Sequence, residues 1–227
     1  MRKIILIIFT FISCFLFATP ESPDVLKYNG IEIELYYFSP AHKYFRDKGL
    51  KAPKEAVGNS ANRDFFTFVY EIFDKKLYLT EVLIDVQKNE SNDDLDNLVE
   101  KNVFNDYFPS EDKILMDVTS VTVIPYGKMI FTEKYGWSDV HYENYLVFEF
   151  INGQVKKSFD FDYNDFKRES KNQFRKLKRT EEYEKLLKSE MIYKKVELYN
   201  ENRPKKLQLS IYEYIKRNIF FEIEFIQ

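Results

Sequence analysis

The stretch that decides the fold of this chain covers residues 65–86 and reads FFTFVYEIFDKKLYLTEVLIDV. Over residues 65–73, successive aromatic and β-branched residues would fall on opposite faces of an extended chain. The same alternation returns over residues 77–86. A period of two is typical of β-strands. Asp74-Lys75-Lys76 separates the two runs by the length of a tight turn. The stretch therefore predicts a β-hairpin.

Further strand patterns lie on both sides of this hairpin. Asn152-Gly153, a pair typical of two-residue hairpin turns, separates two of them. Pro125-Tyr126-Gly127 is expected to break another strand before a short one resumes at Met129. The other predicted strands cover residues 31–36, 114–124, 145–151 and 155–159. Short turns between them favour an antiparallel sheet.

Three segments have helical features. A short helix is expected over residues 42–47, and another begins at Ser91, where Asp94 completes a pattern similar to a capping box and Leu95, Leu98 and Val99 form the apolar face. Residues 164–190 contain no Pro or Gly and space their apolar residues as a helix does. They predict one long helix, or two helices joined near Thr180.

The last part of the chain favours strands. Residues 192–198 alternate in polarity, and the tail over residues 207–226 favours strands, with a helix over residues 211–217 as the alternative. The predicted fold class is α+β: mainly an antiparallel β-sheet or sandwich, with a long helix near residues 164–190. We expect a single domain over residues 31–227.

Residues 1–18 predict export. Arg2 and Lys3 precede an apolar run over residues 4–17, and Ala18 follows it. This arrangement is typical of a signal peptide, followed here by a lead-in segment over residues 19–30. Cleavage after Ala18 would give a periplasmic or extracellular protein. Cleavage after Ser13 would instead leave Cys14 for lipidation and anchor the protein at a membrane surface.

Composition narrows the classes of function. The chain is 44% hydrophobic and 18% aromatic, which is typical of a globular protein. Its net charge of −3 gives no reason to expect a nucleic-acid partner. A single cysteine excludes an intrachain disulfide and a cysteine-only metal site. No cofactor is predicted.

An aromatic, polar loop is the candidate binding site. It contains Tyr135, Trp137, His141 and Tyr142. Exposed aromatic side chains stack on sugars or anchor protein partners, so the predicted partner is an envelope protein or a glycan. The alternative is that Trp137 folds back over the edge of the sheet.

Asp160, Asp162 and Asp165 form the candidate metal site. Alternating aspartates supply the oxygen ligands that calcium prefers, but the glycine and glutamate of a complete calcium loop are absent. Asp165 or Asn164 could instead cap the next helix. Basic residues are frequent over residues 167–179, and Glu181, Glu182 and Glu184 follow closely, which predicts a solvated helix face with i,i+4 pairs.

No catalytic residue is assigned. No serine lies in a Gly-x-Ser-x-Gly motif, and the only cysteine lies in the signal. An enzyme would need His141 as a general base, oriented by Asp139 or Glu143, or the Asp160–Asp165 cluster.

Residues 59–155 resemble a group of small uncharacterised bacterial proteins that share a "WEI…KLYL" hairpin. The resemblance lies in Asn59-Ser60-Ala61-Asn62-Arg63, Tyr70-Glu71-Ile72 and Leu77-Tyr78-Leu79, and later in Pro125-Tyr126-Gly127-Lys128 and the segment over residues 148–153. The group has no known activity, so the resemblance implies a β-rich fold and no site.

These observations predict an exported bacterial envelope protein, non-enzymatic, with a binding or structural role. A hydrolase or metal-dependent enzyme of the envelope is the first alternative, and an inhibitor or immunity-type binder is the second.

Overall fold

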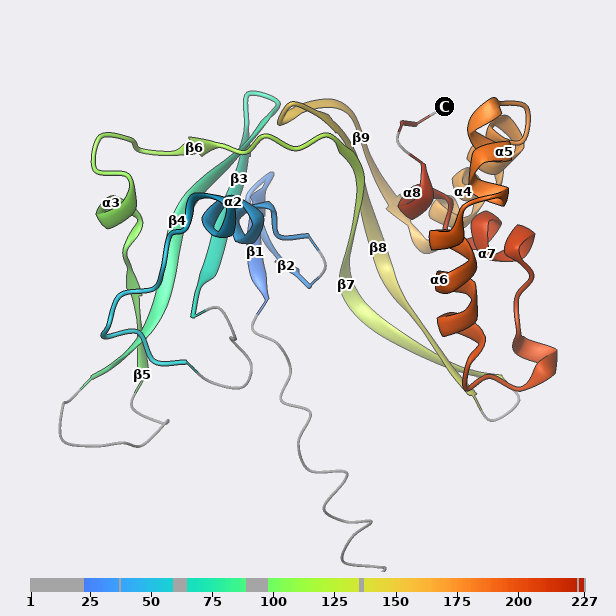
Figure 1. The fold of residues 1–227 in the computed structure, drawn as a ribbon, viewed down its shortest axis with the longest axis horizontal. Helices are drawn as coiled ribbons and strands as arrows, with labels where there is room; N and C mark the ends of the chain where they lie inside the picture. Colours follow the sequence, from blue (N-terminus) through green and yellow to red (C-terminus); the bar gives the residue numbers. More distant parts are fainter. Residues whose placement is uncertain are drawn as a thin grey trace, which may run out of the picture. The chain divides into compact units, whose positions relative to one another are not determined.

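The computed structural model of the protein describes residues 23–36, 38–58, 65–88, 98–134, 137–223 and 225–226. Backbone hydrogen bonds in these ranges join strands in the order β2 (Ile31–Leu35), β1 (Asp24–Tyr28), β3 (Thr67–Phe73), β4 (Lys76–Gln87), β9 (Gln154–Asp162), β8 (Trp137–Ile151) and β7 (Ser120–Lys134) (Figure 1). β5 (Leu98–Asn102) and β6 (Ile114–Leu115) each pair with β4. The pairing is mostly antiparallel, and most of the described helices follow the last strand, which confirms the predicted α+β class.

The chain divides into two compact units. The first unit holds the described residues up to Glu71 together with Leu79–Ile114, and the second holds Ile72–Tyr78 together with the described residues from Leu115 onward. Two compact units can lie within one domain, so the single domain expected over residues 31–227 stays a prediction.

Strands β1 (Asp24–Tyr28) and β2 (Ile31–Leu35) form the first hairpin of the first unit. Asn29 and Gly30 turn it with φ angles of 50° and 79°, as a type I′ turn requires. The lead-in predicted over residues 19–30 thus contains a strand. β1 also pairs in parallel with β3 (Thr67–Phe73), and this pairing later decides the position of Asp24.

The hairpin that decided the fold is confirmed as β3 and β4 (Lys76–Gln87). Helix α2 (Pro40–Lys48) lies where a helix was expected over residues 42–47. The ring centroid of its buried Phe45 lies 5.0 Å from that of Phe66 and 4.9 Å from that of Phe68. These aromatic contacts form the core beside the helix.

The helix predicted from Ser91 is wrong over residues 98–102. They form strand β5 (Leu98–Asn102), which pairs with β4, and only the short α3 (Phe104–Tyr107) is helical. Leu98 and Val99 follow Leu95 in the sequence at helical spacing, but backbone pairing with β4 prevails over that pattern. Residues 91–97 lie outside the described residues.

The second unit contains a long antiparallel ladder. After β6 (Ile114–Leu115), it comprises β7 (Ser120–Lys134), β8 (Trp137–Ile151) and β9 (Gln154–Asp162). Asn152-Gly153 forms the predicted turn, with φ angles of 50° and 76°. The break expected at Pro125–Gly127 is wrong: β7 continues through it, and the register shifts there as at a β-bulge.

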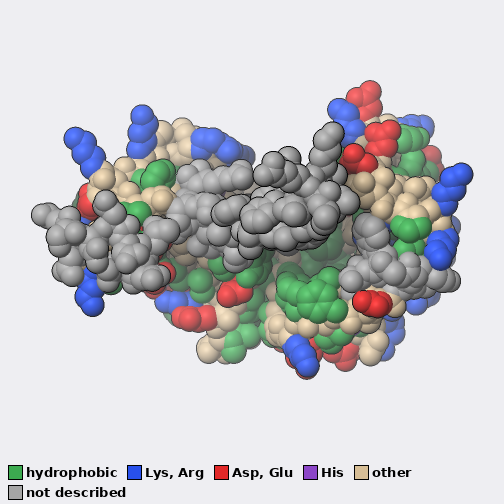
Figure 2. Space-filling model, turned by 90° about the horizontal axis from the view of Figure 1, so that it is seen from below, with side chains coloured by type: hydrophobic (Ala, Val, Ile, Leu, Met, Phe, Trp, Pro, Cys, Tyr) green, Lys and Arg blue, Asp and Glu red, His purple; other side chains and the backbone are tan. Residues whose placement is uncertain are grey.

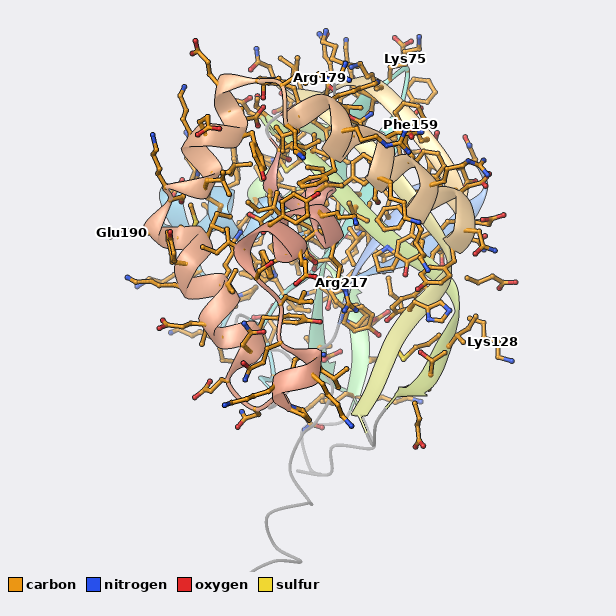
Figure 3. All side chains as sticks on the ribbon, turned by 90° about the vertical axis from the view of Figure 1, so that its right-hand side faces the viewer. Lys75, Lys128, Phe159, Arg179, Glu190 and Arg217 are labelled. Atoms are coloured by element: carbon orange, nitrogen blue, oxygen red, sulfur yellow. The ribbon has the colours of Figure 1, made fainter. Side chains whose placement is uncertain are left out.

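Helices cover one face of this ladder in Figure 3, where they lie in front of the strands and Lys128 points away from them. The long segment near residues 164–190 forms two helices, α4 (Tyr163–Leu177) and α5 (Glu181–Leu187), joined around Thr180 as the second reading predicted. One buried cluster contains Val147 of β8, Phe174 of α4 and Ile192 of α6 (Glu190–Asn200).

The strands predicted after residue 190 are wrong. Residues 192–198 lie in α6 (Glu190–Asn200), and the tail forms η2 (Lys205–Leu207), α7 (Ile211–Arg217) and α8 (Ile219–Glu222). Ile192 and Val196 are four residues apart and both buried, whereas Leu198 is 72% exposed. The period is therefore helical, and the alternation was fortuitous.

The end of the described chain is held against β8. The buried Glu149 accepts a hydrogen bond from the Ile226 N–H at 2.8 Å, and Lys157 lies 3.5 Å from the same carboxylate. Lys157 also donates to the Ile226 carbonyl.

In the part of the chain that the structure describes, no helix has the length and apolarity that a membrane crossing requires.

Candidate functional site

Asp24 is the centre of a buried polar cluster in the first unit. Because β1 runs parallel to β3, the Asp24 carboxylate lies beside Phe68, whose N–H donates to Asp24 Oδ1 at 2.8 Å. Ser39 donates to Oδ2, and the Tyr70 hydroxyl lies 3.4 Å from the same oxygen. The Ala41 N–H in turn donates to the Tyr70 hydroxyl at 3.0 Å. The carboxylate is thus fixed from three directions.

Burial shifts the titration of this cluster. It raises the pKa of Asp24 above its ordinary value, against the opposing effect of the hydrogen bonds from Ser39 and Phe68 and of the nearby His42. Burial, and then the charge of Asp24, raise the pKa of Tyr70 well above its ordinary value. Shifted groups of this kind are concentrated at functional sites.

His42 connects the buried cluster to the surface. Its Nε2 lies 3.9 Å from Asp24 Oδ2, and its ring meets the Phe68 ring edge-on at 4.8 Å between centroids. The His42 side chain is 32% exposed. One side of the imidazole therefore faces the carboxylate cluster, while part of the ring stays accessible.

The accessible part of His42 lines a pocket of about 650 Å³. This volume lies within the range of pockets that hold small molecules, roughly 300–1,000 Å³. All described lining residues belong to the first unit, and none is acidic. They are His42, Phe45, Arg46, Leu50, Lys51, Ala52, Pro53, Lys54, Ala56, Phe65 and Phe66.

The loop that forms one wall of this pocket is held at several points. Gly49 ends α2 in the left-handed conformation, at φ 67°, and redirects the chain into residues 50–57. Tyr107 donates from its hydroxyl to the Lys51 carbonyl at 2.6 Å, and the Val57 N–H donates to the Asp85 carbonyl at 2.8 Å. These bonds hold the backbone of the wall in place.

Aromatic rings form the base of the pocket. Phe45 and Phe66 are buried, and their rings meet edge-on. Phe65 is 38% exposed and has a φ of 64°, which is rare for a side chain of this size. Strained residues of this kind occur at ligand sites, and here the strain coincides with the pocket.

The chemistry of the site favours binding over nucleophilic attack. The hydroxyl of Ser39 donates to the carboxylate of Asp24 and not to a histidine, so these residues do not form a Ser–His–Asp relay. The pocket instead combines rings, an imidazole and the cationic side chains of Arg46, Lys51 and Lys54. These groups can hold a ligand by stacking and by charge.

The structure places Trp137, His141 and Tyr142 in strand β8, so the loop predicted for these residues is wrong. His141 stacks on Tyr163 with centroids 3.8 Å apart, and the Tyr142 N–H donates to the Tyr145 hydroxyl at 2.9 Å. No carboxylate whose side chain is described lies within hydrogen-bond distance of His141.

Other predicted residues lie partly outside the description. Cys14 and Tyr135 fall outside the described residues, and the side chains of Trp137 and Asp139 do as well. Glu143 is described, and its carboxylate accepts a hydrogen bond from the Lys128 N–H at 3.4 Å.

Each aspartate of the candidate metal site has a protein partner. Asp160 accepts a hydrogen bond from the Tyr126 hydroxyl at 2.6 Å, and Asp162 caps α4 by accepting from the Asp165 N–H at 2.8 Å. Asp165 also pairs with Arg168 at 2.8 Å. Within the described residues, no three His, Cys, Asp or Glu side chains come together as metal ligands.

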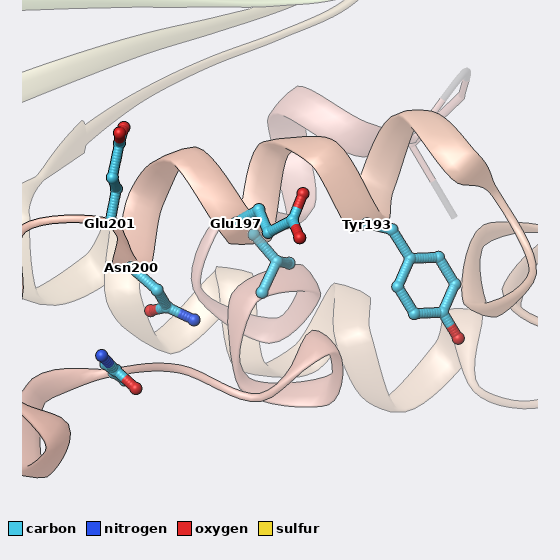
Figure 4. A pocket seen from close by; sticks show the side chains of 6 residues that line it. Tyr193, Glu197, Asn200 and Glu201 are labelled. Carbon is cyan, nitrogen blue, oxygen red and sulfur yellow. The ribbon is translucent and has the colours of Figure 1, made fainter.

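The second unit has two further pockets. One, of about 560 Å³, contains the buried Glu222, which Lys195 contacts at 2.8 Å and 3.0 Å. The other, of about 380 Å³, lies along α6, from which Tyr193 and Glu197 project in Figure 4, with Glu201 just after the helix. Both contain carboxylates, whereas the described lining of the first-unit pocket contains none.

Sequence reasoning missed most of the first-unit site. It predicted the short helix that carries His42 but assigned this histidine no role. Asp24 lay in the expected lead-in, although Asn29-Gly30 is a hairpin signal that would have placed it in a strand. No local pattern connects Asp24 to Tyr70, since their contact depends on the parallel pairing of β1 and β3.

Comparison with known proteins gives no relative: no family model, no curated protein and no solved structure matches the chain. The resemblance of residues 59–155 to a group of bacterial proteins therefore stays a prediction.

Proposed function

We propose that this chain is an exported, non-enzymatic binding protein of the bacterial envelope that holds a small molecule in the first-unit pocket. The observation that carries the proposal is the pocket itself, about 650 Å³ in volume, with His42 placed between it and the buried Asp24. The signal pattern over residues 1–18 supports export.

Pre-formed walls support a binding role. A pocket binds tightly when its walls need little ordering, because ordering them costs free energy and makes binding less favourable. The bonds of the loop over residues 50–57, the left-handed turn at Gly49 and the packed rings of Phe45 and Phe66 supply this order.

Two related dyes test the pocket. 1-Anilinonaphthalene-8-sulfonate and its neutral parent N-phenyl-1-naphthylamine both fluoresce in apolar surroundings, so binding is measured by titration. Ala52 lines the pocket, and Ala52→Trp would fill part of it. We expect this change to weaken dye binding by about tenfold or more, which corresponds to roughly 1.4 kcal/mol.

Lys43→Trp is the matched control, because Lys43 is exposed on the same part of the chain and does not line the pocket. Circular dichroism would verify that both variants fold. Dye affinity that is equal in the wild type and in Ala52→Trp would refute the pocket as the binding site.

Mass spectrometry of the mature N-terminus tests export. A chain that starts at Thr19 supports a soluble exported protein, and an acylated Cys14 supports the lipid-anchored form. A chain that retains Met1 in every cell fraction would contradict export.

A further inference from the structure

We propose that the ligand of the first-unit pocket is an organic anion: an aromatic ring system that carries a carboxylate, sulfonate or phosphate group. This inference rests on the proposed function and adds the chemical class of the ligand. It follows from where the charged and the aromatic side chains of the pocket lie.

The charge of the pocket lining is positive although the chain is acidic. The net charge of the chain is −3, yet Arg46, Lys51 and Lys54 line this pocket and no described carboxylate does. None of the three cations forms an ion pair with a described residue. Their charge is therefore available to a ligand, which must be negative to gain from it.

The positive lining distinguishes this pocket from the rest of the described surface. Acidic and basic side chains are interspersed on the face drawn in Figure 2, so that face carries both signs of charge. The pockets of the second unit contain Glu222 in one case and Glu197 and Glu201 in the other. A lining with cations alone is a property of the first-unit pocket among the described ones.

The depth of each group fixes the orientation of the ligand. Phe45 and Phe66 are buried at the base, whereas Arg46, Lys51 and Lys54 are exposed. His42 and Arg46 lie four residues apart on α2, and therefore on the same face of the helix. A ligand that places its ring against the phenylalanines would thus hold its anionic group at the mouth.

The two dyes test this class directly, since they share one ring system and differ by the sulfonate. We expect the sulfonated dye to bind more tightly than its neutral parent. In Arg46→Gln/Lys51→Gln/Lys54→Gln, its affinity should fall roughly 30-fold, which corresponds to about 0.7 kcal/mol for each exposed charge. The affinity for the neutral dye should stay within about twofold, because its contacts are apolar.

Lys43→Gln is the control, since it removes one charge from α2 outside the pocket and should leave both affinities unchanged. Raising the salt concentration to about 0.5 M should weaken only the sulfonated dye.

Equal loss of both dyes in the triple variant, or equal affinity of the wild type for both, would overturn the assignment of an anion. If Ala52→Trp abolishes binding while the triple variant binds normally, the pocket stands and the ligand class is wrong. If Ala52→Trp changes nothing, the proposed function itself fails.

Discussion

Gly153 offers the sharpest test of the packing in the second unit. It occupies the second position of the turn between β8 and β9 with φ 76°, and a Cβ atom there would lie 2.1 Å from the Met116 carbonyl oxygen. That oxygen belongs to the backbone, so no side-chain rotation can relieve the contact. Gly153→Ala must therefore move the chain around Met116 or open the turn.

The magnitude follows from two contributions. Forcing an alanine into the left-handed region costs about 1–2 kcal/mol. Moving the segment also strains the hydrogen bonds from Met116 N–H to Leu77 O, at 3.0 Å, and from Gly153 N–H to Val118 O, at 2.8 Å. Losing these two bonds costs about 1 kcal/mol each. We expect Gly153→Ala to lower the free energy of unfolding by about 3–4 kcal/mol.

Gly127→Ala is the matched control in the same unit. Gly127 has φ 79°, but the nearest atoms to its Cβ are the ends of the Asn144 and Glu143 side chains, at 3.1 Å and 3.2 Å. These side chains can turn away, so only the backbone cost of about 1–2 kcal/mol remains. Urea unfolding followed by circular dichroism would measure both. Equal destabilisation by the two changes would refute the close approach of Met116 to the turn.

Three further predictions concern ionisable groups. Because burial raises the pKa of Asp24, the folded state holds this proton more tightly than the unfolded state does, so stability should fall as pH rises from about 4 through the raised value; Asp24→Asn should remove that part of the wild-type pH profile in urea unfolding. Lys195→Met should destabilise the protein by about 2–3 kcal/mol, since it leaves the buried Glu222 without its cation, and a further Glu222→Gln should restore most of the loss in the same assay. Burial and the bond to Asp160 raise the pKa of Tyr126 to about 12, so Asp160→Asn should lower it in a tyrosine NMR titration, and an unchanged value would contradict the bond.

Short sequence patterns correctly predicted the hairpins, whose strands are neighbours in the sequence. Asn152-Gly153 and the break at Asp74-Lys75 both turn hairpins, because two-residue turns impose the pairing of the strands beside them. Residues 192–198 show the limit: Ile192 and Val196 satisfy the spacing of a strand face and of a helix face at once. Leu198 would share their face in a strand, and its 72% exposure distinguishes the helix, which the alternation of the sequence alone does not reveal.

The first-unit site was hidden for a different reason. Ser39 and His42 lie at the start of α2 and Tyr70 lies on β3, and a parallel strand pairing brings Asp24 to them. The cations Arg46, Lys51 and Lys54 have ordinary spacings in a charged sequence. Their meaning appears only once the loop over residues 50–57 folds beside α2.

The anchoring of Ile226 on Glu149 sets an order for synthesis and assembly. The partner that Glu149 needs on burial lies 77 residues later in the chain. While the chain is synthesised, β8 is complete long before Ile226 exists, and until then Lys157 of β9 is the described partner that the Glu149 carboxylate can contact. The second unit can therefore close only after the last helices have arrived, and a nascent chain stalled before residue 226 would expose the face of the ladder that those helices cover.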